Sequence, residues 1–203
     1  VGVVGAGYWG PNLIRNFGVL DQCELVAIAD ASAERLEGIG KVFPQVRLAS
    51  SLDDLLEDSK IDAIALATPA DTHYELGKAI IESGRAVFIE KPLARTVSEC
   101  EKLIELARAR GIVLMVGHTF EYNAAVECVG NYIEKQELGE LYYIYSQRLN
   151  LGIVRQDVNA MWNLAPHDIS IALKWLKEMP VAVNARGYTY LQSGVEDVVY
   201  LNL

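Results

Sequence analysis

The sequence lacks any long apolar run, since no stretch approaches the roughly 18 consecutive apolar residues that a membrane-spanning helix needs. Cysteine is scarce: three residues without C-x-x-C spacing predict neither a disulfide framework nor a zinc or other metal site. Positive charge is also sparse, with a net charge of −9 and no stripe of Lys and Arg. These absences argue against a membrane protein and a nucleic-acid-binding protein, and we expect a cytoplasmic protein with reduced cysteines.

Apolar residues, in contrast, are plentiful. They make up 51% of the 203 residues, which is enough for the core of one large domain or two small ones. No signal peptide is visible, although the chain begins within an apolar strand, so we expect that a few N-terminal residues are missing.

The first twenty residues contain a glycine-rich turn between a predicted strand and a predicted helix. Residues 1–4, Val-Gly-Val-Val, read as a short apolar strand, and the pattern G-x-G-x-x-G follows at residues 5–10. Apolar residues then recur with helical spacing over residues 11–20. This order is typical of a dinucleotide-binding turn, in which N–H groups of the helix face a pyrophosphate.

The three glycines have different tasks in such a turn. Gly5 permits the tight turn, Gly7 lets a pyrophosphate approach the backbone, and Gly10 lets the helix pack closely on the strand. Tyr8 and Trp9 lie within the pattern and belong to the predicted cofactor site.

An acidic residue completes this fingerprint. Asp30 follows the apolar strand 24–29 and lies 20 residues after Gly10, where a carboxylate accepts hydrogen bonds from the adenosine ribose. Because a carboxylate there repels a 2′-phosphate, the sequence favours NAD over NADP. The alternative is that Asp30 only caps the helix that starts near Ser32.

Strand and helix signals alternate up to residue 117, which predicts a doubly wound parallel sheet with helices on both faces and a dinucleotide-binding domain over residues 1–118. The further strands are predicted at 46–49, 61–67, 86–89 and 113–116, and the helices at 33–42, from 51, 70–83 and 96–110.

After Gly117 the pattern changes to that of a second α/β domain over residues 119–203, with an open, largely antiparallel sheet. Helices are predicted at 124–135 and 166–176, and strands at 141–149, 181–191 and 195–203. This sheet is incomplete, so we expect the chain to be part of a longer protein.

A lysine follows the strand 86–89, in the sequence Glu90-Lys91-Pro92. A lysine at the carboxyl end of a central strand lies near the crevice where a nicotinamide sits, and partial desolvation there suits proton exchange near neutral pH. The alternative is a surface ion pair between Glu90 and Lys91.

These motifs together resemble the Gfo/Idh/MocA oxidoreductase family: G-x-G-x-x-G at the first turn, Thr68-Pro69 after the fourth strand, and Glu90-Lys91-Pro92 after the fifth. The resemblance implies an N-terminal Rossmann domain for the nicotinamide cofactor, a C-terminal α/β domain for the substrate, and hydride transfer between a sugar or polyol carbon and the nicotinamide.

The resemblance also assigns roles to single residues. It implies that Lys91 is the catalytic lysine and that Glu90 lies near the nicotinamide ribose. It places Thr68, Pro69 and His73 in the loop beside the cofactor.

The second predicted domain contributes Asn163 and His167, which match a family pattern of an acid, three residues and a histidine. Residues at i and i+4 share one helix face, so both side chains can point at one ligand. His167 is the natural acid/base, whereas Asn163 stands where an acid is more usual and can only orient the substrate. Asp168 either orients the imidazole or forms a cap or salt bridge.

A polar stretch before this helix resembles the family branch that oxidises nucleotide-linked sugars, such as UDP-N-acetylglucosaminuronate 3-dehydrogenases. Arginines suit a carboxylate or diphosphate, and asparagines suit sugar hydroxyls. Besides Asn163 and His167, the predicted substrate residues are Tyr122, Asn123, Arg148, Asn150, Arg155, Asn159 and Trp162. The alternative is that Arg148 and Arg155 only pair with nearby acids.

The sequence therefore predicts an NAD-dependent oxidoreductase that acts on a secondary alcohol of a sugar, with nucleotide-linked sugars favoured. It leaves open whether Lys91 or His167 is the principal acid/base. Two alternatives remain: a free polyol or inositol dehydrogenase, and a non-catalytic dinucleotide-binding regulator with the same fold. By analogy with the family, we expect a homo-oligomer, either a dimer or a tetramer.

Overall fold

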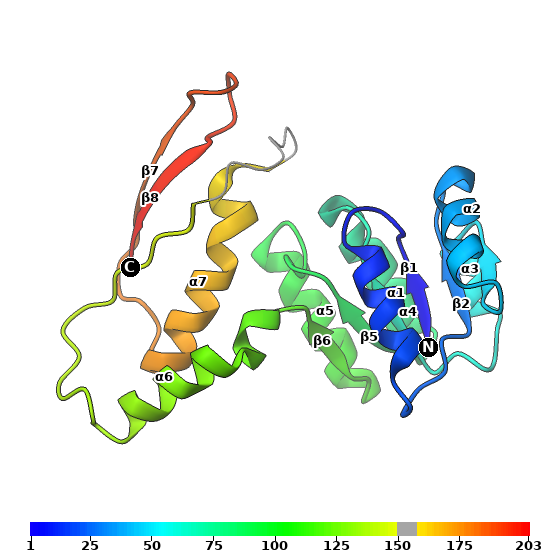
Figure 1. Ribbon diagram of the computed structural model, residues 1–203, viewed down its shortest axis with the longest axis horizontal. Coiled ribbons are helices and arrows are strands. Elements are labelled where there is room, and N and C mark those ends of the chain that lie inside the picture. Colours follow the sequence, from blue (N-terminus) through cyan, green and yellow to red (C-terminus); the bar gives the residue numbers. More distant parts are fainter. Residues whose placement is uncertain (150–157) are drawn as a thin grey trace. The chain divides into compact units, whose positions relative to one another are not determined.

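A computed structural model describes residues 1–149 and 158–203 of the chain (Figure 1). Within these residues the chain divides into two compact units, an N-terminal unit over Val1–Gly117 and a C-terminal unit over His118–Leu203. No helix in the described part of the chain is long and apolar enough to cross a membrane.

The N-terminal unit is built on a six-stranded, all-parallel sheet with the strand order β3-β2-β1-β4-β5-β6. The strands are β1 (Gly2–Val4), β2 (Ala27–Ala29), β3 (Arg47–Ala49), β4 (Ala63–Leu66), β5 (Ala86–Ile89) and β6 (Leu114–Val116). The chain winds outward from β1 to β3 and then restarts at β4 on the other side of β1. The predicted doubly wound parallel sheet is therefore confirmed, and the switch point lies between β1 and β4.

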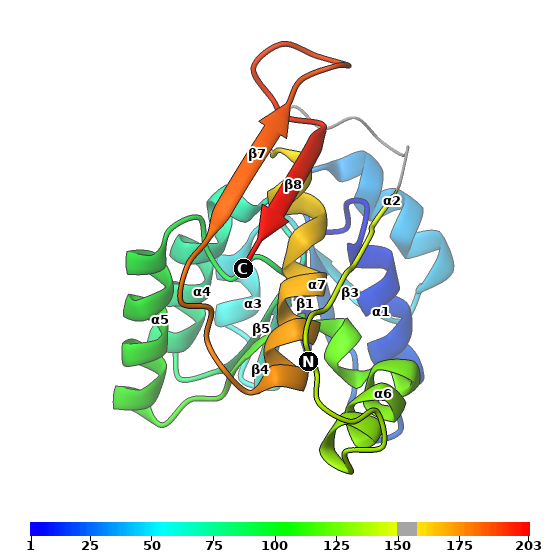
Figure 2. The same cartoon turned by 90° about the vertical axis from the view of Figure 1, so that its left-hand side faces the viewer.

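Helices cover both faces of this sheet, with α1 and α2 on one face and α4 and α5 on the other (Figure 2). The helices are α1 (Gly10–Val19), α2 (Ala33–Val42), α3 (Leu52–Leu56), α4 (His73–Glu82) and α5 (Val97–Arg110), with a 3-10 turn, η1 (Ala70–Thr72), before α4. Thr96 and Glu99 form a capping box at the start of α5, and Gly111 ends that helix in the left-handed conformation.

The core lies in two apolar layers, one on each face of the sheet. Val3 of β1 packs in the layer that contains Ile14 of α1. Its neighbour Val4 packs in the opposite layer, with Ile80 of α4 and Leu103 of α5. Successive strand residues point to opposite faces, so a strand buried on both sides needs the uninterrupted apolar sequence seen here.

The C-terminal unit contains two helices and a two-stranded antiparallel sheet. Its elements are η2 (Thr119–Tyr122), α6 (Ala124–Glu134), α7 (Ala160–Leu176), β7 (Asn184–Tyr188) and β8 (Val198–Asn202). The two helices are joined by the indole N–H of Trp175, which donates to the carbonyl oxygen of Val126 over 2.9 Å. Gly194, with φ +80°, lies in the turn between β7 and β8.

Two predictions for this unit are wrong. Residues 141–149 do not form a strand: within the described residues β7 and β8 are the only strands of this unit, and 141–149 pairs with neither. Residues 141–145, Leu-Tyr-Tyr-Ile-Tyr, have the apolar and aromatic composition of a strand, but a strand also requires a partner for its backbone groups.

The helix predicted to begin at Pro166 begins at Ala160 instead, and Pro166 lies within it. Asn159 sets the start, since its side chain accepts a hydrogen bond from the N–H of Trp162 over 3.1 Å. Proline favours the first turn of a helix, but Pro166 lies in the interior of α7.

Candidate functional site

The glycine-rich turn between β1 and α1 is tightly packed against the chain at two positions. Gly5 has φ +98°, and a Cβ built on it would lie 2.7 Å from the backbone carbonyl of Ala67. A Cβ on Gly10 would lie 2.0 Å from the carbonyl oxygen of Gly5. Neither position can hold a larger residue without a backbone shift.

Gly7 differs from both, because the space beside it is open. A Cβ built on Gly7 would meet only Nη1 of Arg35, at 3.8 Å. No side chain caps the first turn of α1, and no acidic residue lies in that turn, so its positive end is not offset locally. A pyrophosphate can approach the chain at this open edge, which fits the predicted dinucleotide site.

Asp30 follows β2 and is buried at 8% exposure. One carboxylate oxygen accepts from the N–H of Ala6 over 2.6 Å, and the other accepts from the N–H of Ser32 over 2.8 Å. The guanidinium of Arg35 lies 3.6 Å from the second oxygen. Ser32, and not Asp30, is the N-cap of α2, so Asp30 instead connects the glycine-rich turn to the end of β2.

The loops after β4 and β5 are joined by one buried histidine. His73 is 1% exposed, and its Nδ1 lies 2.7 Å from the carbonyl oxygen of Pro92. Its Nε2 lies 2.9 Å from the carbonyl oxygen of Thr68, and the Thr68 hydroxyl accepts a hydrogen bond from the Thr72 hydroxyl. Pro69 is the residue that leads into η1.

Glu90 and Lys91 follow β5 directly. Glu90 is 9% exposed, and a Cβ on Gly117 would lie only 3.0 Å from its carboxyl group. Burial raises the pKa of Glu90, against the opposing effects of the Lys91 backbone N–H, a hydrogen bond with the Trp9 side chain and the charge of Lys91. Lys91 is half-buried.

The remaining two residues of the predicted cofactor site lie nearer to solvent. Tyr8 is 82% exposed and Trp9 is 43% exposed, although the Trp9 side chain reaches Glu90.

In the C-terminal unit, Asn163 and His167 lie one turn apart on α7 and are both half-buried. The ring of Phe120, from η2, lies against the imidazole of His167 with a centroid distance of 4.7 Å. Phe120 is not among the predicted site residues. The available signal was its place between His118 and Tyr122, in the polar segment that follows the sixth strand.

Arg148 completes this cluster. Its guanidinium carbon lies 4.6 Å from the centroid of the Phe120 ring. It also pairs with Asp168 through two contacts, Nε to Oδ2 at 2.6 Å and Nη2 to Oδ1 at 3.3 Å, and the Ser146 hydroxyl donates to Oδ1 at 2.6 Å. Arg148 and Asp168 thus form the ion pair that the sequence analysis kept as an alternative for both residues.

The pKa of Asp168 is lowered as a result. Partial burial raises it, but the hydrogen bonds from Arg148 and Ser146, together with the charges of Arg148 and His167, outweigh burial. The carboxylate is therefore held in its ionised form beside the imidazole.

The other predicted substrate residues fall into three groups. Asn123 and Asn159 are the N-caps of α6 and α7, and the side-chain amide of Asn159 also donates to Glu196 over 3.0 Å. Tyr122 and Trp162 are exposed, at 69% and 46%. Asn150 and Arg155 lie outside the described residues.

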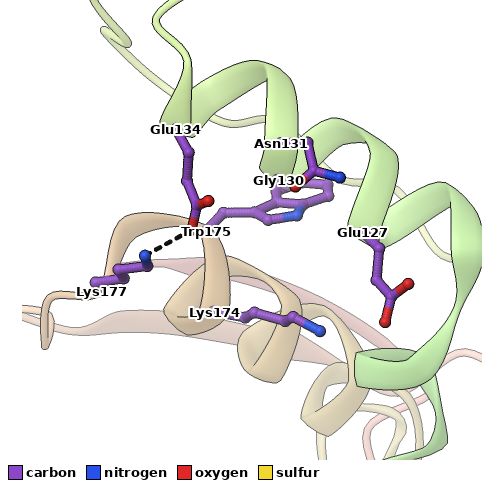
Figure 3. Close-up of a pocket in the computed structure, with 7 residues that line it drawn as sticks. All are labelled: Glu127, Gly130, Asn131, Glu134, Lys174, Trp175 and Lys177. Carbon is purple, nitrogen blue, oxygen red and sulfur yellow. Dashed lines mark hydrogen bonds and ion pairs between the residues drawn. The ribbon is translucent and has the colours of Figure 1, made fainter.

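A hollow of about 350 Å³ lies elsewhere in the C-terminal unit, between α6 and α7 (Figure 3). Trp175 forms part of its wall, and an ion pair of 2.6 Å between Lys177 and Glu134 crosses one side. None of the predicted site residues lines it, so it gives no support to the predicted substrate site.

The chain is similar to relatives that are named as dehydrogenases. The chain is 28% identical over 187 residues to UDP-N-acetylglucosamine 3-dehydrogenase of Acidithiobacillus ferrooxidans. The aligned residues cover 92% of this chain and 57% of the relative. It is 27% identical to inositol 2-dehydrogenase 2 of Saccharopolyspora erythraea over 96% of this chain and 58% of the relative. The chain thus spans little more than half the length of these relatives.

Solved structures show the same fold. The WlbA dehydrogenase of Bordetella pertussis, in complex with NADH and UDP-GlcNAcA, superposes with a TM-score of 0.84 at 27% identity, over 98% of this chain and 61% of that one. GenD2 from gentamicin A biosynthesis, in complex with NAD, has a TM-score of 0.86 at 23% identity, over 98% and 60%.

A family model described as an oxidoreductase family with an NAD-binding Rossmann fold matches residues 1–118. This match covers more than half of the chain and includes the glycine-rich turn, Asp30 and the Glu90-Lys91-Pro92 segment. The chain belongs to the Gfo/Idh/MocA family of oxidoreductases.

Proposed function

We propose that this chain is part of an NAD-dependent dehydrogenase that oxidises a secondary alcohol of a nucleotide-linked sugar to a ketone. The observation that carries the proposal is the combination of an open Gly7, a buried Asp30 and a half-buried Lys91 in a member of this oxidoreductase family. The similarity to a UDP-sugar dehydrogenase over 92% of the chain supports the substrate class.

The N-terminal unit would hold the cofactor. The turn at Gly5, Gly7 and Gly10 would receive the pyrophosphate, Asp30 would accept hydrogen bonds from the adenosine ribose, and Glu90 would lie near the nicotinamide ribose. The residues after β4, from Thr68 to His73, would border the nicotinamide. When bound, the nicotinamide supplies the acceptor for the hydride that leaves the sugar carbon.

Residues of the chain would then accept the hydroxyl proton and stabilise the charge left on the oxygen. His167 takes the proton of the reacting hydroxyl, Lys91 stabilises the developing oxyanion with a hydrogen bond, and Asn163 orients the sugar ring. Asp168 is engaged by Arg148 and Ser146, which leaves the acceptance of the proton to His167.

The assay that tests this proposal follows nicotinamide reduction by the intact protein with NAD and a panel of UDP-sugars, UDP-sugar acids and free polyols. We expect turnover on a nucleotide sugar and a loss of about 10²–10⁴-fold in Lys91→Ala and in His167→Asn, with NAD binding retained. Lys102→Ala is the matched control, since Lys102 is exposed on α5.

A second candidate is a free polyol or inositol dehydrogenase, which the similarity to inositol 2-dehydrogenase 2 favours. Turnover on polyols alone would establish it in place of the first. Tight NAD binding without turnover on any alcohol would contradict both and favour a regulator.

A further inference from the structure

We infer that Phe120 is a positioning residue, whose ring fixes the imidazole of His167 in the orientation that the reaction needs, and that Arg148 braces this ring. This inference rests on the proposed function and adds to it a residue outside the predicted site.

Two polar side chains contact the ring of Phe120. The centroid of the His167 imidazole lies 4.7 Å from that of the ring, and the two planes are inclined at 50°. The guanidinium carbon of Arg148 lies over the same ring, 4.6 Å from its centroid. An aromatic ring suits both partners, because it packs against another ring and its face attracts a cation.

The surroundings of Phe120 are not those of a core residue. Phe120 is only half-buried, and Val126 and Ser170 are the only buried residues among those that the structure describes in the C-terminal unit. A phenylalanine that served stability alone would gain most from a fully buried, apolar environment. The contacts of Phe120 with an imidazole and a guanidinium therefore indicate a task at the candidate site.

That task follows from the chemistry of a catalytic histidine. The torsion that turns an imidazole about its bond to Cβ has only a broad preference, so packing must select the orientation of the ring. An acid/base group must bring one ring nitrogen within hydrogen-bond reach of the reacting hydroxyl, and a misplacement of about 1 Å can cost about 10²-fold in rate. A ring at 4.7 Å restricts this rotation of His167.

Arg148 fixes the ring of Phe120 to α7. While its guanidinium lies over the ring, its Nε and Nη2 bind the carboxylate of Asp168, which is the residue after His167. The Arg148 and Asp168 side chains are only 28% and 25% exposed. Imidazole, ring, guanidinium and carboxylate thus form a closed series of contacts that begins and ends on neighbouring residues of α7.

The backbone of η2 is fixed to the same helix. The amine of Lys174 donates to the carbonyl oxygen of Glu121, the residue after Phe120. Lys174 lies seven residues after His167 on α7, and residues at i and i+7 share one face of a helix. The face of α7 that presents His167 therefore also holds the segment that carries Phe120, as a precise site requires.

The experiment compares Phe120→Leu, which removes the ring and keeps an apolar side chain, with Phe120→Tyr, which keeps the ring. It measures KM and the single-turnover rate of nicotinamide reduction by the intact protein, with NAD and the best substrate of the UDP-sugar panel. We expect Phe120→Leu to lower the rate about 10- to 100-fold and to change KM less than about threefold. Phe120→Tyr should stay within about threefold of the parent in both, because the ring remains.

Two further variants complete the set. Arg148→Lys keeps a cation for Asp168 but removes the planar group over the ring, so its rate should lie between those of the parent and Phe120→Leu. Tyr132→Leu is the matched control, because Tyr132 is an aromatic residue of the same unit that is 45% exposed on α6. It should change neither the rate nor KM.

Nuclear magnetic resonance gives a second readout that does not depend on turnover. The chain has three histidines, so the ring protons of His167 can be assigned by their absence in His167→Asn. The ring current of Phe120 shifts the signals of protons near it. The His167 signals should therefore move in Phe120→Leu and remain near their parent positions in Phe120→Tyr and Tyr132→Leu.

The opposite results are distinct. A parental rate in Phe120→Leu, or His167 signals that do not move, would overturn the inference and leave the proposed function intact. A raised KM at an unchanged rate would also overturn it, because Phe120 would then contact the substrate. If Phe120→Leu shows no cooperative thermal transition, Arg148→Lys decides, and a parental rate in that variant would overturn the inference. No turnover of any alcohol by the parent would overturn the proposed function and the task of Phe120 together, whatever the His167 signals show.

Discussion

The sheets of the two units differ in how they are covered. Every residue of β1 and β2 is buried, with helices on both faces of the sheet, whereas every residue of β7 is exposed and β8 alternates between exposed and half-buried residues. Stability in the N-terminal unit therefore comes mainly from close packing. In the described part of the C-terminal unit, it depends more on polar pairs such as Arg148–Asp168 and on helix caps.

The largest expected effect tests the packing of the N-terminal unit. Gly10→Ala should lower the free energy of unfolding by at least about 3 kcal/mol, because its Cβ would overlap the Gly5 carbonyl oxygen and force a backbone shift. Gly38→Ala is the matched control in the exposed interior of α2, with no atom within 4 Å of the new Cβ. We expect it to stabilise the protein by about 0.5–1 kcal/mol. Chemical denaturation followed by tryptophan fluorescence and by circular dichroism measures both, and equal effects would contradict this interpretation.

A smaller effect is expected from the ion pair of the C-terminal unit. Asp168→Asn should cost about 1–2 kcal/mol, because it leaves the three-quarters-buried guanidinium of Arg148 without its charged partner. Since the folded-state pKa of Asp168 is lowered, its contribution is fully present above the ordinary value of 3.8 and is lost as the pH falls through the lowered value. Parent and variant should therefore converge in strongly acidic solution. A double-mutant cycle with Arg148→Leu, measured at neutral pH, would refute the pairing if the two losses simply added.

In the N-terminal unit, we expect Glu90 to change the free energy of unfolding with pH in the opposite direction to Asp168. Its folded-state pKa is raised above the ordinary value of 4.5, so the native state holds the proton more tightly than the unfolded state. Stability should therefore fall as the pH rises from about the unfolded pKa through the folded one, by at most about 1.4 kcal/mol per pH unit. Glu90→Gln should remove this fall. Unfolding curves between pH 4 and 8 measure it, and parallel pH profiles for the two proteins would contradict the assignment.

The smallest effect is expected from a surface pair. Lys177 and Glu134 approach to 2.6 Å, but both side chains are more than half exposed. Lys177→Ala should move the thermal midpoint by less than about 2 °C, since water and salt screen such pairs. A clearly larger shift would show that short contacts stabilise this unit even in solvent.

The same difference in burial explains why the elements of the N-terminal unit were predicted better than those of the C-terminal unit. The six parallel strands and their helices followed from apolar runs and cap residues, because a strand buried on both faces has few alternatives. In the C-terminal unit, residues 141–149 had the aromatic composition of a strand but pair with neither β7 nor β8. The sequence placed the start of a helix at Pro166, whereas Asn159 is the N-cap of that helix.

Parts of the candidate site depend on contacts between distant residues, which a sequence pattern does not contain. The fingerprint glycines and Asp30 follow a fixed spacing and were therefore visible. Phe120 carries no such spacing, and its position emerges only when η2 packs on α7. For the same reason the resemblance of the polar stretch indicated Arg148 as a residue of interest but did not identify Asp168 as its partner.

The two contacts of His73 have a mechanical consequence. One rigid ring spans the carbonyl of Thr68 and the carbonyl of Pro92, so the loops after β4 and β5 cannot separate without breaking a contact inside the protein. Lys91 immediately precedes one of these anchor points. The two loops should therefore move together as one rigid unit, and any displacement of one during ligand binding would be shared by the other.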